Sequence, residues 1–425
     1  MRKVGLVLAV LALMALPAMA QDMNIMGAGA RAHGMGGAFI AIADDATSIS
    51  WNPAGLAQLD KPEASAVGLF NMKTFNNEWS YNDPTIPYDT AATEENKVSH
   101  IAPNFFSLAV PFKAADRNLV LAVAYNRMID FGEAQSEDTL IAGIKYESSY
   151  KQTGGIDAIS PAIAFQLTPK LALGFTGNII VNGSTYKEEE TGTDGYSYDY
   201  EETMDFSGFN MHMGMLAQIS KQFTVGLAYR MPFEMTRKSE WEWSETIPGV
   251  GTTSGSGEDV YEQKWTMPWM LGVGAAFRPS DNMTLAFDYE HRAYNSSEWT
   301  YGPISDENFW NNVNQFRVGM EYLFIGSTAV FPVRLGFRTN PQVYFAEERF
   351  TDASWNDTVD STGMNGMVFT GGFGMKFGKI WFDLAAEYGI TTVYSYEHTY
   401  WDNTVYKEET KENSLNMLAS CIVHF

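Results

Sequence analysis

The sequence contains little cysteine, little positive charge and few long apolar runs. Cys421 is the single cysteine among 425 residues, which excludes an intramolecular disulfide framework. The 28 lysines and arginines are outnumbered by 51 aspartates and glutamates, and so acidic a chain is a poor ligand for nucleic acid phosphates. Beyond residue 20, no stretch approaches the roughly eighteen apolar residues of a membrane-spanning helix. We therefore expect no disulfide scaffold, no nucleic acid partner and no transmembrane helix.

Motifs of catalysis and metal binding are also lacking. The six histidines form no HExxH pair and no ligand cluster, and no G-x-S-x-G sequence occurs. Gly27-x-Gly29-x-x-Ala32 matches a dinucleotide fingerprint loosely, but it does not follow a strand. A serine–histidine site assembled across strands is the one catalytic alternative left open. We predict no enzyme, no metal site and no cofactor.

The first twenty residues have the pattern of a secretory leader. Arg2 and Lys3 precede an apolar run, and Ala18-Met19-Ala20 forms a small-x-small cleavage site. The apolar run is too short for a spanning helix, which is typical of a signal peptide. We predict a signal peptide over residues 1–20 and export of the remaining chain.

From about residue 63 onwards, apolar and polar residues alternate along one segment after another. Phe316 and Val318, for example, alternate with Arg317 and Gly319. Successive side chains of a strand face opposite sides, so each segment has one apolar and one polar face. The pattern predicts fourteen strands, at 63–72, 103–112, 118–127, 159–166, 171–181, 209–219, 223–231, 269–277, 283–291, 315–323, 331–338, 367–376, 379–390 and 415–425.

The links between these segments alternate between short and long. Thr168–Lys170 and Ser220–Gln222 are short, whereas the alternate links are long and rich in Asp, Glu, Asn, Tyr and Trp. A soluble β-sandwich would share the alternation, but short turns at one end and long loops at the other are typical of outer-membrane barrels. We predict an all-β, transmembrane antiparallel β-barrel of about fourteen strands over residues 63–425, in the outer membrane of a Gram-negative cell.

The apolar faces carry two further membrane signals. Tyr125, Tyr229, Tyr289 and Tyr388 fall near the outer ends of their strands, as an interfacial aromatic girdle requires. The last strand ends on Phe425, an aromatic terminus of the kind that barrel-insertion machinery reads. Both signals favour a barrel that is inserted into a membrane.

Residues 21–62 do not alternate and are rich in glycine and alanine. Glycine lets backbone approach backbone, so such a segment can pack tightly inside a cavity. Its run GMGGAFIAIADDATSISWNPAGLA, residues 34–57, resembles the N-terminal hatch of the FadL/TodX family of outer-membrane transporters. The stretches 223–233, 268–294 and 316–322 are similar to the same family, although only the Asn-Pro-Ala motif of the hatch is specific.

The resemblance implies that residues 21–62 form a small hatch that plugs the lumen. Proline fixes its own φ and favours an extended Asn52, while Asp44 and Asp45 can cap a short helix. These residues either only fold the plug or also gate the lumen. The hatch motif comprises Gly36, Gly37, Asp44, Asp45, Asn52, Pro53 and Ala54.

The resemblance also implies passive transport of hydrophobic compounds, with long-chain fatty acids foremost. The alternatives are a plugged or partly open porin for small solutes, and a secretion-accessory or binding barrel of the type IX shuttle kind. We expect as partners a long-chain fatty acid or another hydrophobic small molecule, outer-membrane lipids including lipopolysaccharide, and the barrel-insertion machinery. The barrel is expected to be a monomer.

Two groups of residues are candidates for ligand binding. Arg230, Arg317, Arg334 and Arg338 fall on the polar, lumen-facing sides of their strands. Buried charge needs partners, so a salt-bridge network that anchors the hatch is one interpretation. The other is that one or two arginines receive a substrate carboxylate, which a guanidinium matches bidentately.

Tryptophans in the long links form the second group. An exposed aromatic cluster there can form a loop groove through which a hydrophobic ligand enters. In the alternative interpretation, the same residues pack the loops together or lie at the membrane interface. The tryptophans predicted to line the groove are Trp241, Trp243, Trp265, Trp310 and Trp355.

Overall fold

The computed structural model describes most of the chain after the predicted leader. The described residues are 25–82, 90–114, 116–141, 143–259, 261–301, 304–306, 312–341, 343, 356–358, 365–399 and 405–425. The predicted signal peptide lies outside them. Across these ranges, no helix has both the length and the apolar character that a membrane span requires.

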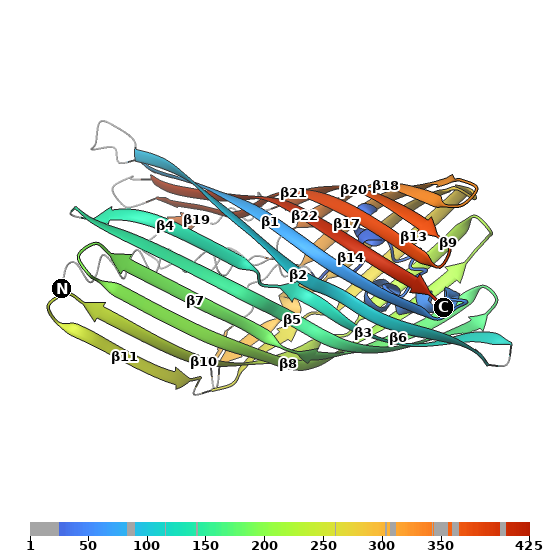
Figure 1. Cartoon of the computed structure of the whole chain (residues 1–425), viewed down its shortest axis with the longest axis horizontal. Coiled ribbons are helices and arrows are strands. Elements are labelled where there is room, and N and C mark those ends of the chain that lie inside the picture. The colour runs from blue at the N-terminus through green and yellow to red at the C-terminus, as the bar shows by residue number, and fades with distance from the viewer. Residues whose placement is uncertain are drawn as a thin grey trace.

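Fourteen antiparallel strands pair in chain order and close into a barrel, because the first strand also pairs with the last (Figure 1). Each predicted segment lies within one of these strands or exceeds it by a single residue at one end, so the predicted barrel is confirmed, although many strands are longer than predicted. The strands are β1 (Glu63–Asn82), β2 (Thr90–Ala114), β3 (Arg117–Asp130), β5 (Ile144–Thr168), β6 (Leu171–Val181), β8 (Ser197–Gln218), β9 (Phe223–Arg230), β13 (Met270–Ser280), β14 (Met283–Arg292), β17 (Val313–Ile325), β18 (Val330–Pro341), β20 (Asn365–Phe377), β21 (Ile380–Thr399) and β22 (Val405–His424).

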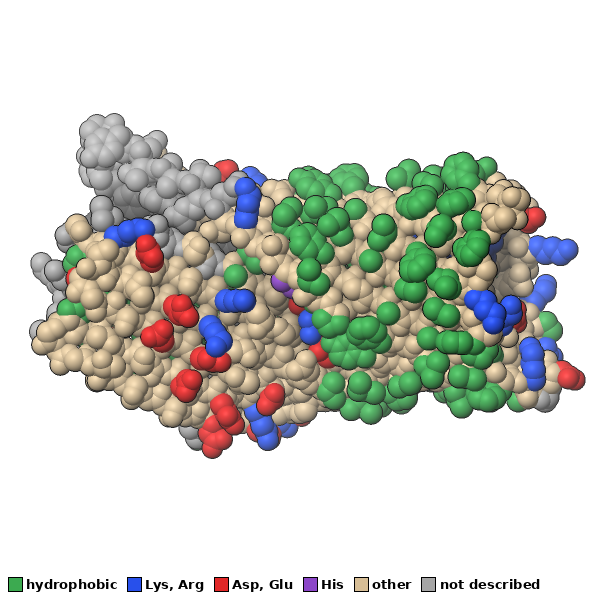
Figure 2. All heavy atoms as spheres, in the orientation of Figure 1, with side chains coloured by type: hydrophobic (Ala, Val, Ile, Leu, Met, Phe, Trp, Pro, Cys, Tyr) green, Lys and Arg blue, Asp and Glu red, His purple; other side chains and the backbone are tan. Residues whose placement is uncertain are grey.

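An apolar band surrounds one half of the barrel. Figure 2 shows hydrophobic side chains gathered over the right half of the molecule, whereas charged side chains are scattered over the left half. Val318 and Leu335 point outwards in this band, and their neighbours Arg317 and Arg334 are buried inside. Alternating apolar and buried polar residues mark this half as the part that spans the bilayer.

The strands extend well beyond the apolar band. β1, β21 and β22 have 20 residues each, and β2 and β5 have 25, whereas a tilted strand needs about 9–11 residues to cross a bilayer. Further strands continue or border the barrel at this end. They are β4 (Glu133–Ile141), β7 (Gly183–Gly192), β10 (Phe233–Ile247), β11 (Gly251–Glu258), β12 (Gln263–Met267), β15 (Glu298–Tyr301), β16 (Ile304–Asp306) and β19 (Asn356–Thr358).

The prediction that the long links are loops is therefore wrong for much of their length. In β7, for example, Lys187 and Glu189 point outwards while Glu188 lies on the opposite face. Outside the bilayer water can solvate both faces of a strand, so its hydrophobicity need not alternate. The sequence pattern therefore does not predict strands there, although the backbone remains paired.

Residues 25–62, the N-terminal segment, lie inside the barrel. The segment contains α2 (Ala30–Gly34), α3 (Ser48–Trp51) and the 3-10 helix η2 (Pro53–Gln58); a further 3-10 turn, η3 (Tyr294–Ser296), follows β14. Helix η2 contacts β5, β6 and β8, while α2 contacts β18, β20, β21 and β22. These strands lie in separate parts of the closed ring, so the segment extends across the lumen. Every residue from Gly27 to Ala43 is buried.

Candidate functional site

The N-terminal segment is hydrogen-bonded to the inner face of the barrel through its main chain. The backbone N–H groups of Phe39 and Ile40 donate to Oδ2 of Asp288 on β14, at 2.7 and 2.9 Å. The N–H of Gly36 donates to Oγ1 of Thr370 on β20, at 2.9 Å. Buried N–H groups require acceptors, and inward polar side chains of distant strands supply them here. The wall is thus built to hold this segment.

Glycines allow the segment to lie directly on the wall. Gly36 has φ +67°, a left-handed conformation that favours glycine. A Cβ at this position would lie 2.7 Å from the backbone N of Phe337 on β18. On the wall side, a Cβ at Gly336 would collide with the backbone of Met35 and Gly36. The backbones of segment and strand therefore meet because neither carries a side chain at the contact.

The Asn-Pro-Ala motif links the segment to itself and to β8. Asn52 is extended, with φ −155° and ψ 99°, and its Oδ1 accepts a hydrogen bond from the N–H of Ala54 at 3.2 Å. Its Nδ2 donates to the carbonyls of Ile40, at 2.7 Å, and Met215, at 3.1 Å. Pro53 occupies the first position of η2, where no N–H is needed.

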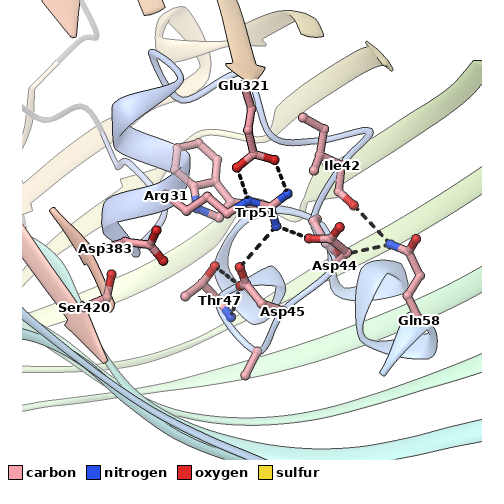
Figure 3. A network of polar contacts seen from close by, with 12 residues as sticks. Arg31, Ile42, Asp44, Asp45, Thr47, Trp51, Gln58, Glu321, Asp383 and Ser420 are labelled. Carbon is pink, nitrogen blue, oxygen red and sulfur yellow. Dashed lines mark hydrogen bonds and ion pairs between the residues drawn. The ribbon is translucent and has the colours of Figure 1, made fainter. Parts of the chain in front are cut away.

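Arg31 is the centre of a buried charge network (Figure 3). Its Nε and Nη2 donate to the two carboxylate oxygens of Glu321 on β17, at 3.0 and 2.9 Å, and its Nη1 pairs with Asp44. Asp45 accepts from the N–H of Thr47 at 2.9 Å and lies 3.8 Å from Arg31. Burial alone would lower the pKa of Arg31, but Asp44 and Glu321 outweigh it and hold that pKa well above its ordinary value. Burial raises the pKa of Asp45, against the opposing effect of Arg31.

Two of the four predicted arginines belong to the same kind of network. Arg334 binds Glu321 at 2.7 Å and Asp383 at 2.6 Å, and Arg338 binds Glu387 at 2.5 and 3.0 Å. Their guanidinium groups already face carboxylates from the adjacent strand β17 and from β21, which lies beyond β20. This geometry corresponds to the interpretation as a salt-bridge network.

Arg317 and Arg230 differ in their partners. Arg317 lies 3.2 Å from the carboxylate of Glu290 and donates to Gln315 at 2.8 Å. Arg230 donates to carbonyls of the N-terminal segment, at 2.8 Å to Ser50 and 3.5 Å to Ile25. All four arginines are thus in the lumen beside the segment. A role in receiving a ligand carboxylate stays a prediction.

The tryptophans predicted to line a groove are placed on strands where they are described. Trp241 and Trp243 lie on β10 with the inward parity of Met235, and Trp265 lies on β12 with the inward parity of Met267. Trp243 lines an open cavity of about 660 Å³ together with residues of β7, β8 and β11. Trp310 and Trp355 lie outside the described residues, so the groove as a whole stays a prediction.

A methionine-rich apolar cluster in the lumen was missed by the sequence interpretation. It is lined by five methionines and three phenylalanines from five strands and the β3–β4 link, and Trp265 packs against it. We call it the methionine cluster: Met128, Phe131, Met204, Phe206, Phe233, Met235, Met267 and Met270, together with Ile25, Ile129, Ile156, Ala158 and Ile180. Ile25, at the start of the N-terminal segment, joins it from below.

The composition of this cluster suits binding of variable apolar shapes. Methionine is unbranched and polarizable, so it adapts to irregular surfaces and makes favourable contacts with aromatic rings. The signal in the sequence was present but dispersed, because the methionines are separated by up to 142 positions, from 128 to 270. Only the closure of the barrel brings them together.

A polar cavity of about 160 Å³, the lumen cavity, lies beside the methionine cluster. Met128 and Ile129 line the cavity and also belong to the cluster. The remaining lining includes Asn71 and Asn104 from β1 and β2, and Met26 from the N-terminal segment. The lumen thus offers an apolar surface and a polar cavity in direct contact.

Comparison with known proteins agrees with this architecture. Residues 6–328 match the family model for the outer membrane protein transport protein (OMPP1/FadL/TodX). No curated protein sequence matches the chain. Among solved structures, a Pseudomonas aeruginosa FadL homologue is similar at 12% identity and a TM-score of 0.61, covering 94% of this chain and 98% of that one.

Two toluene transporters show the same fold. TbuX of Ralstonia pickettii has 13% identity and a TM-score of 0.57, with 95% of this chain and 99% of that one covered. TodX of Pseudomonas putida has 12% identity and a TM-score of 0.58, with 95% and 100% covered. At such identities the structures establish the fold alone, whereas the family model spans more than half of the chain. The chain therefore belongs to the OMPP1/FadL/TodX family of outer-membrane transport proteins.

Proposed function

We propose that this barrel is a passive outer-membrane transporter of hydrophobic compounds, with long-chain fatty acids as its main substrates. The observation that carries the proposal is the methionine cluster, an apolar surface inside a lumen whose other walls are charged. A pore for polar solutes gains nothing from such a surface. The similar structures are named as a FadL homologue and as toluene transporters, which supports a hydrophobic ligand.

In this proposal the N-terminal segment is the hatch that closes the lumen. Its contacts at Gly36, Asn52 and Arg31 hold it across the barrel, and shifts in the segment release the ligand inward or sideways. No energy source is required, because the transfer of the ligand's apolar surface from water to the apolar lumen is favourable by itself. The buried arginines belong to the salt-bridge network that anchors the hatch.

The surroundings of the barrel complete the proposal. In this proposal the protein acts as a monomer and carries its ligands without transforming them. Its acidic outer half faces the lipopolysaccharide layer, where divalent cations bridge carboxylates to lipid phosphates, and its aromatic C-terminus is read by the insertion machinery. A secretion-accessory barrel would instead bind a large exported protein.

The test is mass spectrometry of small molecules that the purified barrel retains. We expect lipids or fatty acids in a ratio approaching one per chain, and fewer after Met235→Asp, which places a charge in the methionine cluster. The matched control is Val250→Asp, at an exposed position in the turn between β10 and β11 and not in the cluster. Retention of no hydrophobic molecule, or co-purification of a secreted protein instead, would contradict the proposal.

A further inference from the structure

We propose that the lumen cavity is a head-group subsite, which takes a hydroxyl hydrogen-bond donor of an amphiphile whose chain lies on the methionine cluster. The inference rests on the proposed function and adds the chemistry of the ligand's polar end. A pure hydrocarbon would use the methionine cluster alone. Three independent features of the cavity support a neutral donor: its charge balance, its open acceptors and its backbone.

The charged groups of the cavity are already paired with one another. A free carboxylate ligand would have to displace one of these partners, and a free ammonium ligand likewise. The three carboxylates that line the cavity each have a cation: Asp130 with Arg127 at 3.6 Å, Glu387 with Arg338 at 2.5 Å, and Glu412 with Lys73 at 3.4 Å. Because opposite charges neutralise each other there, the cavity favours an uncharged group.

Three buried polar atoms of the cavity can accept hydrogen bonds and have no partner in the described part of the chain. Oδ1 of Asn71, Oδ1 of Asn104 and Nδ1 of His100 are buried and have no hydrogen-bond partner among the residues that the structure describes. Nε2 of His100 lies 2.6 Å from Oδ2 of Asp130, and in the tautomer whose Nε2–H donates to this carboxylate, Nδ1 has the acceptor role. Asn71 is only 8% exposed. Three buried acceptors around one cavity are complementary to a ligand that brings O–H or N–H groups.

A β-bulge directs Asn104 into the cavity. Gly68 of β1 pairs with Pro103 and Val67 pairs with Phe105, so Asn104 is an extra residue between them. Bulges re-aim a side chain and are frequent next to active sites. Without the bulge, Asn104 would alternate with the buried Phe105 and point to the lipid. The shift in register thus places the polar side chain of Asn104 inside the barrel.

A second bulge, in the adjacent strand β3, supplies the apolar neighbour. Arg127 pairs with Asp157 and Ile129 with Ile156 of β5, which leaves Met128 as the extra residue. Met128 lines the lumen cavity and belongs to the methionine cluster. Each of the two neighbouring strands β2 and β3 therefore has a bulge that points one side chain into the lumen cavity. Asn104 contacts the head group of the ligand, and Met128 contacts its chain.

The experiment is equilibrium dialysis of three twelve-carbon probes against the full chain in amphipol. Dodecanol has a donor, methyl dodecanoate has none, and dodecanoate is ionised at pH 8. We expect dodecanol to bind about three- to tenfold more tightly than the ester, the effect of one to two added hydrogen bonds. Asn104→Ala removes this preference and leaves ester binding unchanged, whereas Met128→Ala weakens all three probes alike.

The outcomes separate the inference from the proposed function. Asn295→Ala, an exposed asparagine outside the cavity, is the matched control. If dodecanoate binds more strongly at low pH than at pH 8 and Asn104→Ala abolishes this gain, a protonated fatty acid is the source of the donor. If lowering the pH does not strengthen dodecanoate binding, the source is a hydroxylated lipid. Equal binding of dodecanol and ester overturns the inference alone, as does tight binding of dodecanoate at pH 8 that depends on Asn104. Failure of all three probes to bind overturns the proposed function.

Discussion

The half of the barrel inside the apolar band and the half beyond it consist of the same strands but differ in the side chains on their outer faces. Inside the band, Leu335 and Leu384 face outwards, 56% and 59% exposed, and the inner face is charged. Beyond it, β7 and β10 carry glutamates and lysines on their outer faces. The contrast teaches that lipid enforces the alternation, while backbone pairing continues wherever the chain has a neighbour.

The charges of the two halves also differ in their surroundings. Arg334 is 1% exposed and binds two carboxylates, whereas Lys187 and Glu201 form a pair on the outer surface. A buried charge cannot fall back on water when its partner is removed, but an exposed one can. The stability of the barrel is therefore expected to depend on the inner network and hardly on the outer pairs.

Arg334→Ala should produce the largest effect. It leaves Asp383 buried without its cation, and Glu321 with Arg31 alone, so we expect a loss of about 3–5 kcal/mol in the free energy of unfolding. The measurement is urea unfolding in lipid vesicles, followed by tryptophan fluorescence. Lys187→Ala is the matched change in the outer half and should leave the unfolding midpoint unchanged. Similar losses in both variants would refute the division between the halves.

Val318→Arg tests the apolar band itself. Val318 is an outward residue of β17 and 49% exposed, so we expect the arginine to cost about 2–4 kcal/mol near the bilayer midplane. Val250, 78% exposed at the tip of the β10–β11 hairpin, offers the control. Val250→Arg should fold and insert like the parent chain. A tolerated Val318→Arg would mean that the band is not in contact with lipid.

Gly336→Val should dislodge the N-terminal segment. A Cβ there collides with the backbone at Gly36, so the segment must shift, at a cost of about 1–3 kcal/mol for overpacking. We expect a higher single-channel conductance in planar bilayers. In Gly371→Val, the nearest atom to a new Cβ is the carbonyl oxygen of Arg334 at 3.9 Å, and conductance should stay low. Low conductance in both variants would show that the segment does not close the lumen.

The barrel could be predicted because its membrane-spanning strands are constrained by two solvents at once. Phe316 to Tyr322 alternates without interruption, and β17 contains it with the predicted parity. Beyond the band this constraint is absent, and Gly183–Gly192 was read as part of a loop although it is a strand. The limits of the prediction thus coincide with the limits of the bilayer.

The candidate site could be predicted only in part. Arg334 and Arg338 were placed in the lumen by their parity. Their partners lie on other strands, so identifying them requires the register in which the strands pair. The bulges at Asn104 and Met128 reverse the parity that the prediction uses, so no alternation pattern reveals them. Trp243 was read as a loop residue because its strand has polar residues on both sides.

The most direct test of the central claim compares two fluxes through the purified barrel in liposomes. Labelled oleate trapped by acyl-CoA synthetase inside the vesicles reports hydrophobic transport, and osmotic swelling in arabinose reports an open aqueous pore. We predict oleate uptake that is faster than in empty liposomes and is reduced by Met235→Asp, with no swelling in arabinose. Rapid swelling without accelerated oleate uptake would contradict a transporter in which the ligand crosses an apolar, closed lumen.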